Sequence, residues 1–283
     1  MGRAGKSPPG LVGWREGYKL GVTTKGASAM SAVLQDEIRV YWMTGCTSCL
    51  RTKEFLARHR VPFASRNVLV DEAAYAELER FGLRQVPIVT RGDAWANGQV
   101  LRDVAELVGI DLGAPQILPV AELRRRQEAI LGGAARFAAQ LPEESLGTLL
   151  PDRPRSHADL VYHIVNIVDA FLEHEAGIPL SYESYFRLPP RAEKAELLAY
   201  AADVAGRLRA WFDGPGRGRD WTETAQVYYG QQSLHEFLER TVWHSGQHTR
   251  QLMWVLERMG IAPDGKLGPE VFAGLPMPQE VWG

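Results

Sequence analysis

The chain has 283 residues, 45% of them hydrophobic, so it can bury two cores, and we expect two domains. A formal net charge of −2 and a pI near 6.4 give no electrostatic reason to expect nucleic acid or an anionic membrane as a partner. No apolar run approaches the length of a bilayer span, which predicts a soluble protein. Two cysteines, spaced for catalysis and not for cross-linking, suit a reducing cytoplasm.

Residues 1–34 are predicted to be a disordered leader. The first thirty residues are rich in Gly, Lys, Ser and Pro and lack the continuous apolar core that a secretory signal needs. Met30 immediately precedes the part of the sequence that begins to look folded, which makes it a candidate for the true start of the protein.

The first domain is expected over residues 35–113, as an alternation of strands and helices that defines an α/β unit. Buried strands are predicted from β-branched and aromatic runs, and helices from apolar residues at helical spacing. The expected elements are a strand at 38–42, a helix at 50–57, an extended segment at 61–70, a helix capped by Asp71, a strand at 84–90, a short strand at 94–96 and a helix at 101–108.

Cys46 and Cys49 stand where the first predicted strand feeds a helix. At a helix N-terminus, unpaired N–H groups and the macrodipole stabilise a thiolate on Cys46, and Cys49 lies one turn later, within reach to resolve a mixed disulfide. Such a pair is a redox device. A structural disulfide would close too small a loop to stabilise much, and a structural zinc site would need two more ligands where only His59 is near.

Pro87 falls within the third predicted strand, where a central strand normally excludes proline. A cis Val86–Pro87 bond is one reason for a proline here, because it would turn the Val86 backbone toward Cys46 and let it pair with a bound peptide or thiol. An ordinary proline on an edge strand is the alternative.

The segment from Ile38 to Ile110 resembles a glutaredoxin of the thioredoxin fold. The residues that carry this resemblance are Val40-Tyr41-Trp42, Cys46-Thr47-Ser48-Cys49, Gln85-Val86-Pro87 and Asn97-Gly98. The resemblance implies that Cys46 is the nucleophile and Cys49 the resolving thiol. It also implies glutathione or another low-molecular-weight thiol as co-substrate, bound by Gln85, Val86, Pro87, Asn97 and Gly98. Thr47 and Ser48 depart from the usual Pro-Tyr pair, which leaves both monothiol and dithiol mechanisms open.

The second domain is expected over residues 119–262, after a short linker at 114–118. Strand-type runs give way there to long segments of 3.6-residue periodicity, which predict an all-α domain. Four helices that can share one core as a bundle are expected at 119–141, after Ser156 as N-cap, at 191–212 and at 231–259. Residues 263–283 form an apolar tail that we expect to dock on the bundle or between the domains.

Three histidines of this bundle are candidate metal ligands. His244 and His248 are four apart and project from one helix face, and His163 faces inward from another helix. Three neutral imidazoles make an open site with a position left for water, thiolate or substrate. His174 lies three turns from His163, about 16 Å away, and is excluded from the same ion. A buried polar cluster without metal is the alternative.

Several neighbours of these histidines have weaker roles. Asp159 and Asn166 are spaced to orient the His163 ring. Glu236 and Arg240 either continue the His244 face as an ion pair or decorate the surface, and we favour decoration. His157 stands at a helix start and is expected to face solvent.

His163 followed by His244 and His248 makes residues 118–260 similar to the DinB-like superfamily, whose bundles often place one His on the second helix and His-x3-His on the fourth. The similarity implies a divalent metal site, for zinc, nickel or iron, and several members use it to activate a low-molecular-weight thiol for transfer or isomerisation.

Together the two halves predict a thiol-disulfide oxidoreductase coupled to a metal-binding domain, with a thiol-dependent transferase reaction as its expected extension. Its expected substrates are small thiols or disulfides, and a protein disulfide and a homodimer partner are further candidates. The alternative is a redox, metal or small-ligand sensor or binding protein without substantial turnover.

Overall fold

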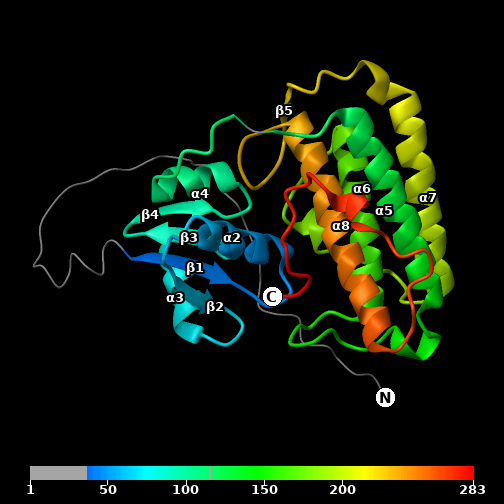
Figure 1. Cartoon of the computed structure of the whole chain (residues 1–283), viewed down its shortest axis with the longest axis horizontal. Coiled ribbons are helices and arrows are strands. Elements are labelled where there is room, and N and C mark those ends of the chain that lie inside the picture. The colour runs from blue at the N-terminus through cyan, green and yellow to red at the C-terminus, as the bar shows by residue number, and fades with distance from the viewer. Residues whose placement is uncertain (1–36, 115) are drawn as a thin grey trace, which may run out of the picture.

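The computed structural model describes residues 37–114 and 116–283, which form two domains side by side (Figure 1). The expected leader at 1–34, including Met30, lies outside the described residues. The first domain is a small mixed sheet with helices and the second is helical, so the predicted fold class, α/β followed by all-α, is confirmed. Within the described ranges, none of the helices combines the length and the apolar character needed to span a bilayer.

The sheet of the first domain has the order β2-β1-β3-β4. Its strands are β1 (Ile38–Trp42), β2 (Ala64–Asn67), β3 (Ile88–Arg91) and β4 (Ala94–Asn97). β1 pairs in parallel with β2 and antiparallel with β3, which pairs antiparallel with β4. A parallel pair needs a crossover connection, and α2 (Thr47–Arg58) supplies it. The Cys-x-x-Cys motif therefore begins a crossover helix.

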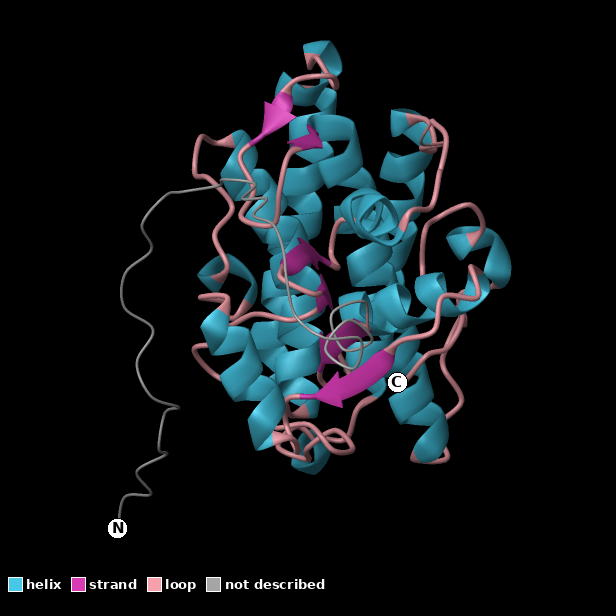
Figure 2. Ribbon diagram, turned by 90° about the vertical axis from the view of Figure 1, so that its left-hand side faces the viewer, coloured by secondary structure: helices cyan, strands magenta, loops and turns pink. Residues whose placement is uncertain are grey.

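Helices cover both faces of the sheet (Figure 2). Alternate strand residues point to opposite faces, so each face presents apolar side chains for a helix to bury. Val40 and Val89 pack with α2 and with α4 (Leu101–Val108). Tyr41 and Ile88, the residues adjacent to them on the same strands, pack against α3 (Glu72–Arg80). This alternation fixes the side of the sheet on which α2 and its first residue lie.

Two local predictions in this domain are corrected. The extended segment expected at 61–70 ends as a strand at Asn67, because a turn follows before Asp71 caps α3 by accepting a hydrogen bond from the Ala74 amide at 3.1 Å. The third strand begins only at Ile88, after a cis Val86–Pro87 bond. Pro87 thus precedes the strand, where its missing N–H leaves no gap in the ladder.

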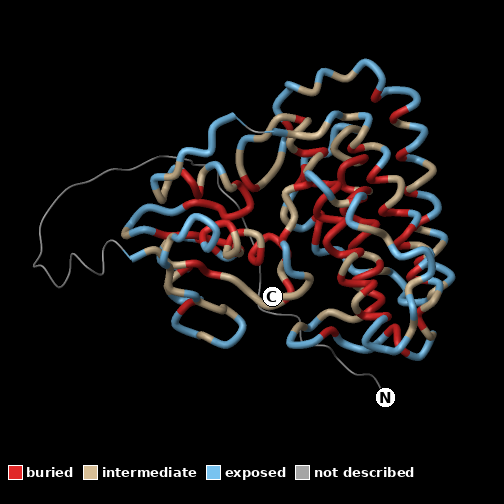
Figure 3. Tube along the Cα trace, viewed as in Figure 1, coloured by how far each residue is buried: buried red, intermediate tan, exposed pale blue. Residues whose placement is uncertain are grey.

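The second domain is a bundle of four long helices whose buried residues lie on their facing sides (Figure 3). The helices are α5 (Val120–Gln140), α6 (His157–Glu175), α7 (Lys194–Asp213) and α8 (Leu234–Arg258). Ser156 and Ser233 cap α6 and α8 in capping boxes with the acidic residue three positions later. The shorter elements are η1 (Glu143–Ser145), η2 (Glu183–Tyr185), η3 (Pro215–Gly218), β5 (Thr224–Ala225), β6 (Gln232–Ser233) and α9 (Pro269–Phe272).

The C-terminal tail lies between the two domains and contacts both. Gln247 and Gln251 on α8 donate side-chain hydrogen bonds to the carbonyl of Val281, each at 3.1 Å. On the other side, the amide of Gly45 donates to the carbonyl of Gly283 at 3.0 Å. The tail therefore connects the loop between β1 and α2, which contains Gly45, to the longest helix of the bundle.

Side chains also join the domains directly. The guanidinium of Arg51 on α2 lies 4.7 Å from the centre of the Trp243 ring on α8. Arg102 on α4 forms an ion pair with Glu236 at the start of α8, with a nitrogen–oxygen distance of 3.2 Å. The first contact places α2 beside the middle of α8, and the second places α4 beside its start.

Candidate functional site

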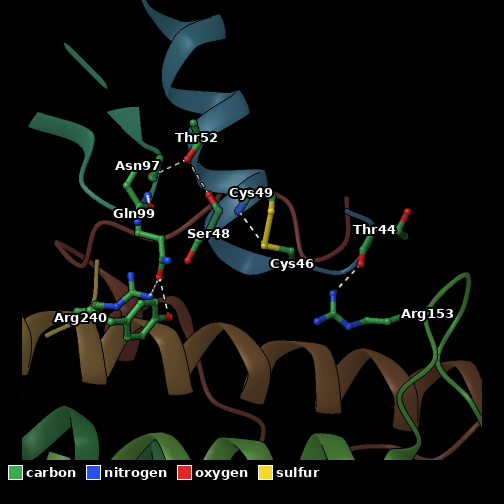
Figure 4. Close-up of a disulfide and its surroundings, with 11 residues drawn as sticks. Thr44, Cys46, Ser48, Cys49, Thr52, Asn97, Gln99, Arg153 and Arg240 are labelled. Atoms are coloured by element: carbon green, nitrogen blue, oxygen red, sulfur yellow. Dashed lines mark hydrogen bonds between the residues drawn. A yellow bond between two sulfur atoms is a disulfide. The ribbon is translucent and has the colours of Figure 1, made fainter. Parts of the chain in front are cut away.

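A disulfide joins Cys46 and Cys49 at the start of α2 (Figure 4). Cys46 is the N-cap residue, and its Sγ accepts a hydrogen bond from the Cys49 amide at 3.2 Å. Cys49 is fully buried (0% exposed), whereas Cys46 is half-buried and lines a pocket. An incoming thiol or disulfide can reach only Cys46, which supports the expected roles of nucleophile and resolving thiol.

The five residues expected to bind a thiol divide into two groups. Val86 lines the same pocket as Cys46, and Gln85 is buried beside it with its side-chain oxygen unpartnered among the described residues. Asn97 and Gly98 build the turn after β4: Gly98 donates to the Pro87 carbonyl at 2.9 Å, and a Cβ at Gly98 would meet the Pro87 ring at 2.9 Å. Val86 is therefore the one residue of these five that lines the pocket beside Cys46.

The three predicted histidines converge in the bundle. His163 on α6 lies with its ring centre 5.4 Å from that of His244 and 4.7 Å from that of His248, both on α8. One ring nitrogen from each lies within 4.8 Å of the others, and all three side chains are buried. Residues from two helices, more than 80 positions apart in the chain, thus present three nitrogens to one point.

The ring nitrogens fit a metal site. Nδ1 of His163 and Nδ1 of His244 are buried and have no hydrogen-bond partner among the described residues, which is costly unless a ligand satisfies them. Nδ1 of His248 donates to the side-chain oxygen of Gln251 at 2.7 Å, so its other nitrogen keeps a free lone pair. Three neutral nitrogen donors suit zinc, nickel or iron.

Burial keeps these imidazoles neutral. Desolvation lowers the pKa of His163, His244 and His248 well below 6.5, and nearby positive charge from Arg155 lowers it further for His163 and His248. Neutral imidazole is the form that donates a lone pair to a cation. These three residues could hold a metal at neutral pH without first losing a proton.

Three expectations about neighbours of His163 are wrong. Asp159 caps α6 by accepting from the Ser156 amide at 2.8 Å, and Asn166 donates to the Ser184 carbonyl at 2.7 Å, so neither contacts the His163 ring. Both groups satisfy backbone atoms that would otherwise be unpaired. His157 is 6% exposed and does not face solvent, and its amide donates to the Thr148 carbonyl at 3.0 Å, in the loop before α6.

One pocket joins the two predicted centres. It is lined by Cys46 and Val86 from the first domain and by all three histidines from the bundle, with Tyr182, Tyr185 and Tyr228 as aromatic walls. Its volume is about 50 Å³, which is room for a few water molecules or a small ligand group. A ligand in this space would contact the thiol and the imidazoles together.

Arg240 lines the pocket, although sequence reasoning favoured a surface position for it. It is 4% exposed, donates a hydrogen bond to the side-chain oxygen of Gln99, and lies 4.2 Å above the Tyr229 ring. The sequence did contain a signal that Arg240 lies near the site, because it precedes His244 by one turn on the same face of α8. The decoration hypothesis failed because this face of α8 packs against the other domain.

Comparison with known proteins agrees with this geometry. Residues 38–95 match the family model for glutaredoxin, and residues 116–252 match that for the DinB superfamily. The fold and the site define a thioredoxin-type redox domain followed by a histidine-bearing helix bundle. The chain is thus a fusion of a glutaredoxin domain and a DinB superfamily domain, as predicted, and the glutaredoxin match supports a thiol-redox function at family level.

Two solved structures are similar to this chain. One is a DinB-like protein from Bacillus cereus, with 14% identity and a TM-score of 0.42 over 52% of this chain and 97% of that one. The other is a glutathione S-transferase from Xanthobacter autotrophicus, with 17% identity and a TM-score of 0.28 over 82% of this chain and 97% of that one. No curated protein matches the chain.

Proposed function

We propose that this protein is a thiol-disulfide oxidoreductase whose exchange reaction takes place beside a metal site, and that it uses the thiol so produced in a transfer reaction. The observation that carries this proposal is the shared pocket, because Cys46 and the three histidines line one cavity. The glutaredoxin match supports a small thiol or disulfide as substrate.

The exchange needs two steps. The Cys46 thiolate attacks one sulfur of a small disulfide, forms a mixed disulfide with that half, and releases the other half as a thiolate. Cys49 then loses its proton and attacks Cys46 Sγ, which closes the Cys46–Cys49 disulfide and releases the second thiolate. The substrate gains two electrons and the dithiol loses two. Two equivalents of glutathione, or of another low-molecular-weight thiol, restore the dithiol and become a disulfide themselves.

The chain stabilises the Cys46 thiolate in two ways. The N-terminus of α2 directs its free N–H groups at the sulfur, and the Cys49 amide already donates to it. Arg153 adds a positive charge to the pocket lining, held in place by a hydrogen bond from Nη1 to the Thr44 carbonyl at 2.6 Å (Figure 4). Both effects lower the pKa of an attacking thiol.

His163, His244 and His248 would hold the divalent metal that the DinB similarity implies. A bound cation lowers the pKa of a thiol or water that it contacts. The thiolate released by Cys46 forms in the same cavity as these histidines, which supports a thiol-dependent transfer in that cavity.

The test follows a mixed disulfide of glutathione and a small thiol. We expect the wild type to reduce it, Cys46→Ser to lose all exchange, and Cys49→Ser to accumulate a mixed disulfide on Cys46, seen by mass spectrometry as the added mass of one substrate half. His59→Ala, at the exposed end of α2, serves as the control. Exchange that persists in Cys46→Ser would refute the proposal.

A redox sensor is the second candidate, favoured by the hydrogen bond between the Gly45 amide and the Gly283 carbonyl. Reduction of the Cys46–Cys49 disulfide, next to Gly45, could release the tail from the first domain. This candidate predicts slow turnover. It also predicts that the arrangement of the two domains differs between oxidised and reduced protein, a difference that small-angle scattering would detect. An unchanged scattering profile together with rapid turnover contradicts it.

A further inference from the structure

We propose that the ligand of the shared pocket is a small thiol or disulfide that also carries an acidic group, such as a carboxylate. The acidic group binds to Arg153, Arg155 and Arg240 of the bundle domain. This inference rests on the proposed function, because it names the class of substrate that the same pocket takes.

The lining of the pocket is strongly unbalanced in charge. Three arginines line it, and no aspartate or glutamate is among its lining residues. Desolvation lowers the pKa of Arg153 to about 10 and that of Arg155 to about 9. The positive charge of Arg153 lowers the pKa of Arg155 further. Arg240 is buried and Arg153 and Arg155 are half-buried, and a guanidinium withdrawn from water without a counterion is costly, so an anion in the pocket would stabilise all three.

Donor groups of these arginines are free to bind such an anion. The Arg155 side chain makes no hydrogen bond or ion pair within the described part of the chain, and Asp159, the carboxylate that acts on it, is occupied in the capping box of α6. Nε and Nη1 of Arg240 are buried and have no hydrogen-bond partner among the described residues. Guanidinium groups with free N–H groups match a carboxylate in shape and charge.

The arginines lie between the two reactive centres. Arg153 and Arg240 flank the Cys46–Cys49 disulfide on the side of the bundle (Figure 4). Arg155 lines the same pocket as His163 and His248. An acidic group held by these side chains would leave the sulfur of a short molecule between Cys46 and the histidines.

Charge balance at the metal site leads to the same conclusion. Imidazole binds a cation as a neutral ligand, so the three histidines would cancel none of the charge of a divalent cation held between them. The Cys46 thiolate alone supplies one negative charge against three guanidinium groups and the cation. At least one further anion is needed for the pocket to approach neutrality, and a bound substrate is the group that can provide it.

The test uses three disulfides with the same two-carbon arms and different end groups: dithiodipropionate, hydroxyethyl disulfide and cystamine. Each kcat/KM is divided by the rate constant for reduction of the same probe by free glutathione, which removes intrinsic reactivity. We expect the wild type to prefer the dianion over the neutral probe by tenfold or more, since hydrogen bonds to charged groups contribute about that factor or more. The cationic probe should be the poorest substrate.

The variants test the assignment to the arginines. Arg155→Gln should lower the preference for dithiodipropionate over hydroxyethyl disulfide by about tenfold, and Arg155→Lys should restore part of it. Arg125→Gln removes the same charge from an exposed position on α5 and should leave the preference unchanged. Equal preference for all three probes, or a preference that Arg155→Gln does not alter, would overturn the inference.

A failure of the proposed function gives a different result. If hydroxyethyl disulfide is not reduced at all, the exchange reaction is wrong, and binding decides the inference instead. Calorimetry then follows dithiodipropionate with the metal-free Cys46→Ser protein, so that neither exchange nor coordination contributes. Binding that Arg155→Gln abolishes supports an anion site, and the absence of binding rejects it.

Discussion

The side-chain oxygen of Gln99 accepts a hydrogen bond from Nη2 of Arg240, and this bond crosses from the glutaredoxin domain to the DinB-like bundle. Both residues line the shared pocket. The same oxygen accepts a second hydrogen bond from the Tyr228 hydroxyl at 3.3 Å. One amide oxygen therefore joins the two domains at the site where their chemistry meets.

Gln99→Ala should destabilise this junction. It removes a hydrogen bond from a guanidinium that is buried and already has unpaired nitrogens, so the free energy of unfolding should fall by about 1–3 kcal/mol. Denaturant titration of the full chain measures the change. Gln231→Ala, an exposed glutamine just before α8, should stay within about 0.5 kcal/mol of the wild type. Equal stability of the two variants would show that the bond does not join the domains.

Removal of one predicted ligand should abolish metal binding. The wild type should contain about one equivalent of divalent metal, and His163→Ala or His244→Ala should lose affinity by more than the roughly 10–100-fold caused by residues that only orient a ligand. Elemental analysis after dialysis measures the content, with the exposed His59→Ala as control. A wild-type protein without metal, even after incubation with zinc, nickel and iron, would favour a buried polar cluster.

Stability should depend on pH through Glu239. Burial, opposed by Arg51, raises the pKa of this carboxyl from 4.5 to about 7. Between these values the unfolded chain has lost the proton that the folded protein keeps, so the free energy of unfolding falls as pH rises through this window and levels off above pH 7. Below 4.5 both states are protonated and the contribution is complete.

Glu239→Gln removes this dependence. Relative to the wild type, the variant should gain about 1–2 kcal/mol between pH 5.5 and pH 8.5, because the glutamine carries no charge to desolvate. Denaturant titration at the two pH values gives the difference. Glu196→Gln, at an exposed site on α7, serves as control. A gain of the same size in both variants would assign the effect to net charge.

The tail should protect the backbone amide of Gly45 from hydrogen exchange. Trp282 stacks on Trp254 of α8 with ring centres 5.4 Å apart, and a Cβ at Gly45 would lie 3.2 Å from its indole. Trp282→Ala should lower the free energy of unfolding by about 1–3 kcal/mol and speed hydrogen exchange at the Gly45 amide, which donates to Gly283. Trp95→Ala, at an exposed position on β4, should leave that exchange rate unchanged. Equal rates in both variants would mean that the tail does not protect this amide.

The sequence alone determined most of the helices and strands of each domain, and the placement of the two cysteines at the start of a helix. Strand and helix periodicity, the cap residues Asp71 and Ser156, and the position of Cys46 at a helix start all depend on neighbours within a few residues. The convergence of His163 with His244 and His248 was also predictable, because inward faces of bundle helices meet in one core.

Tertiary structure decided how the two centres relate. The sequence carries no local signal that Cys46 and the histidines share a cavity, that Arg155 lines the same cavity, or that Arg240 is buried against Gln99. These contacts join residues far apart in the chain, across an interface between two domains. Periodicity reports which face of a helix is buried, but only the packed structure decides which domain covers that face.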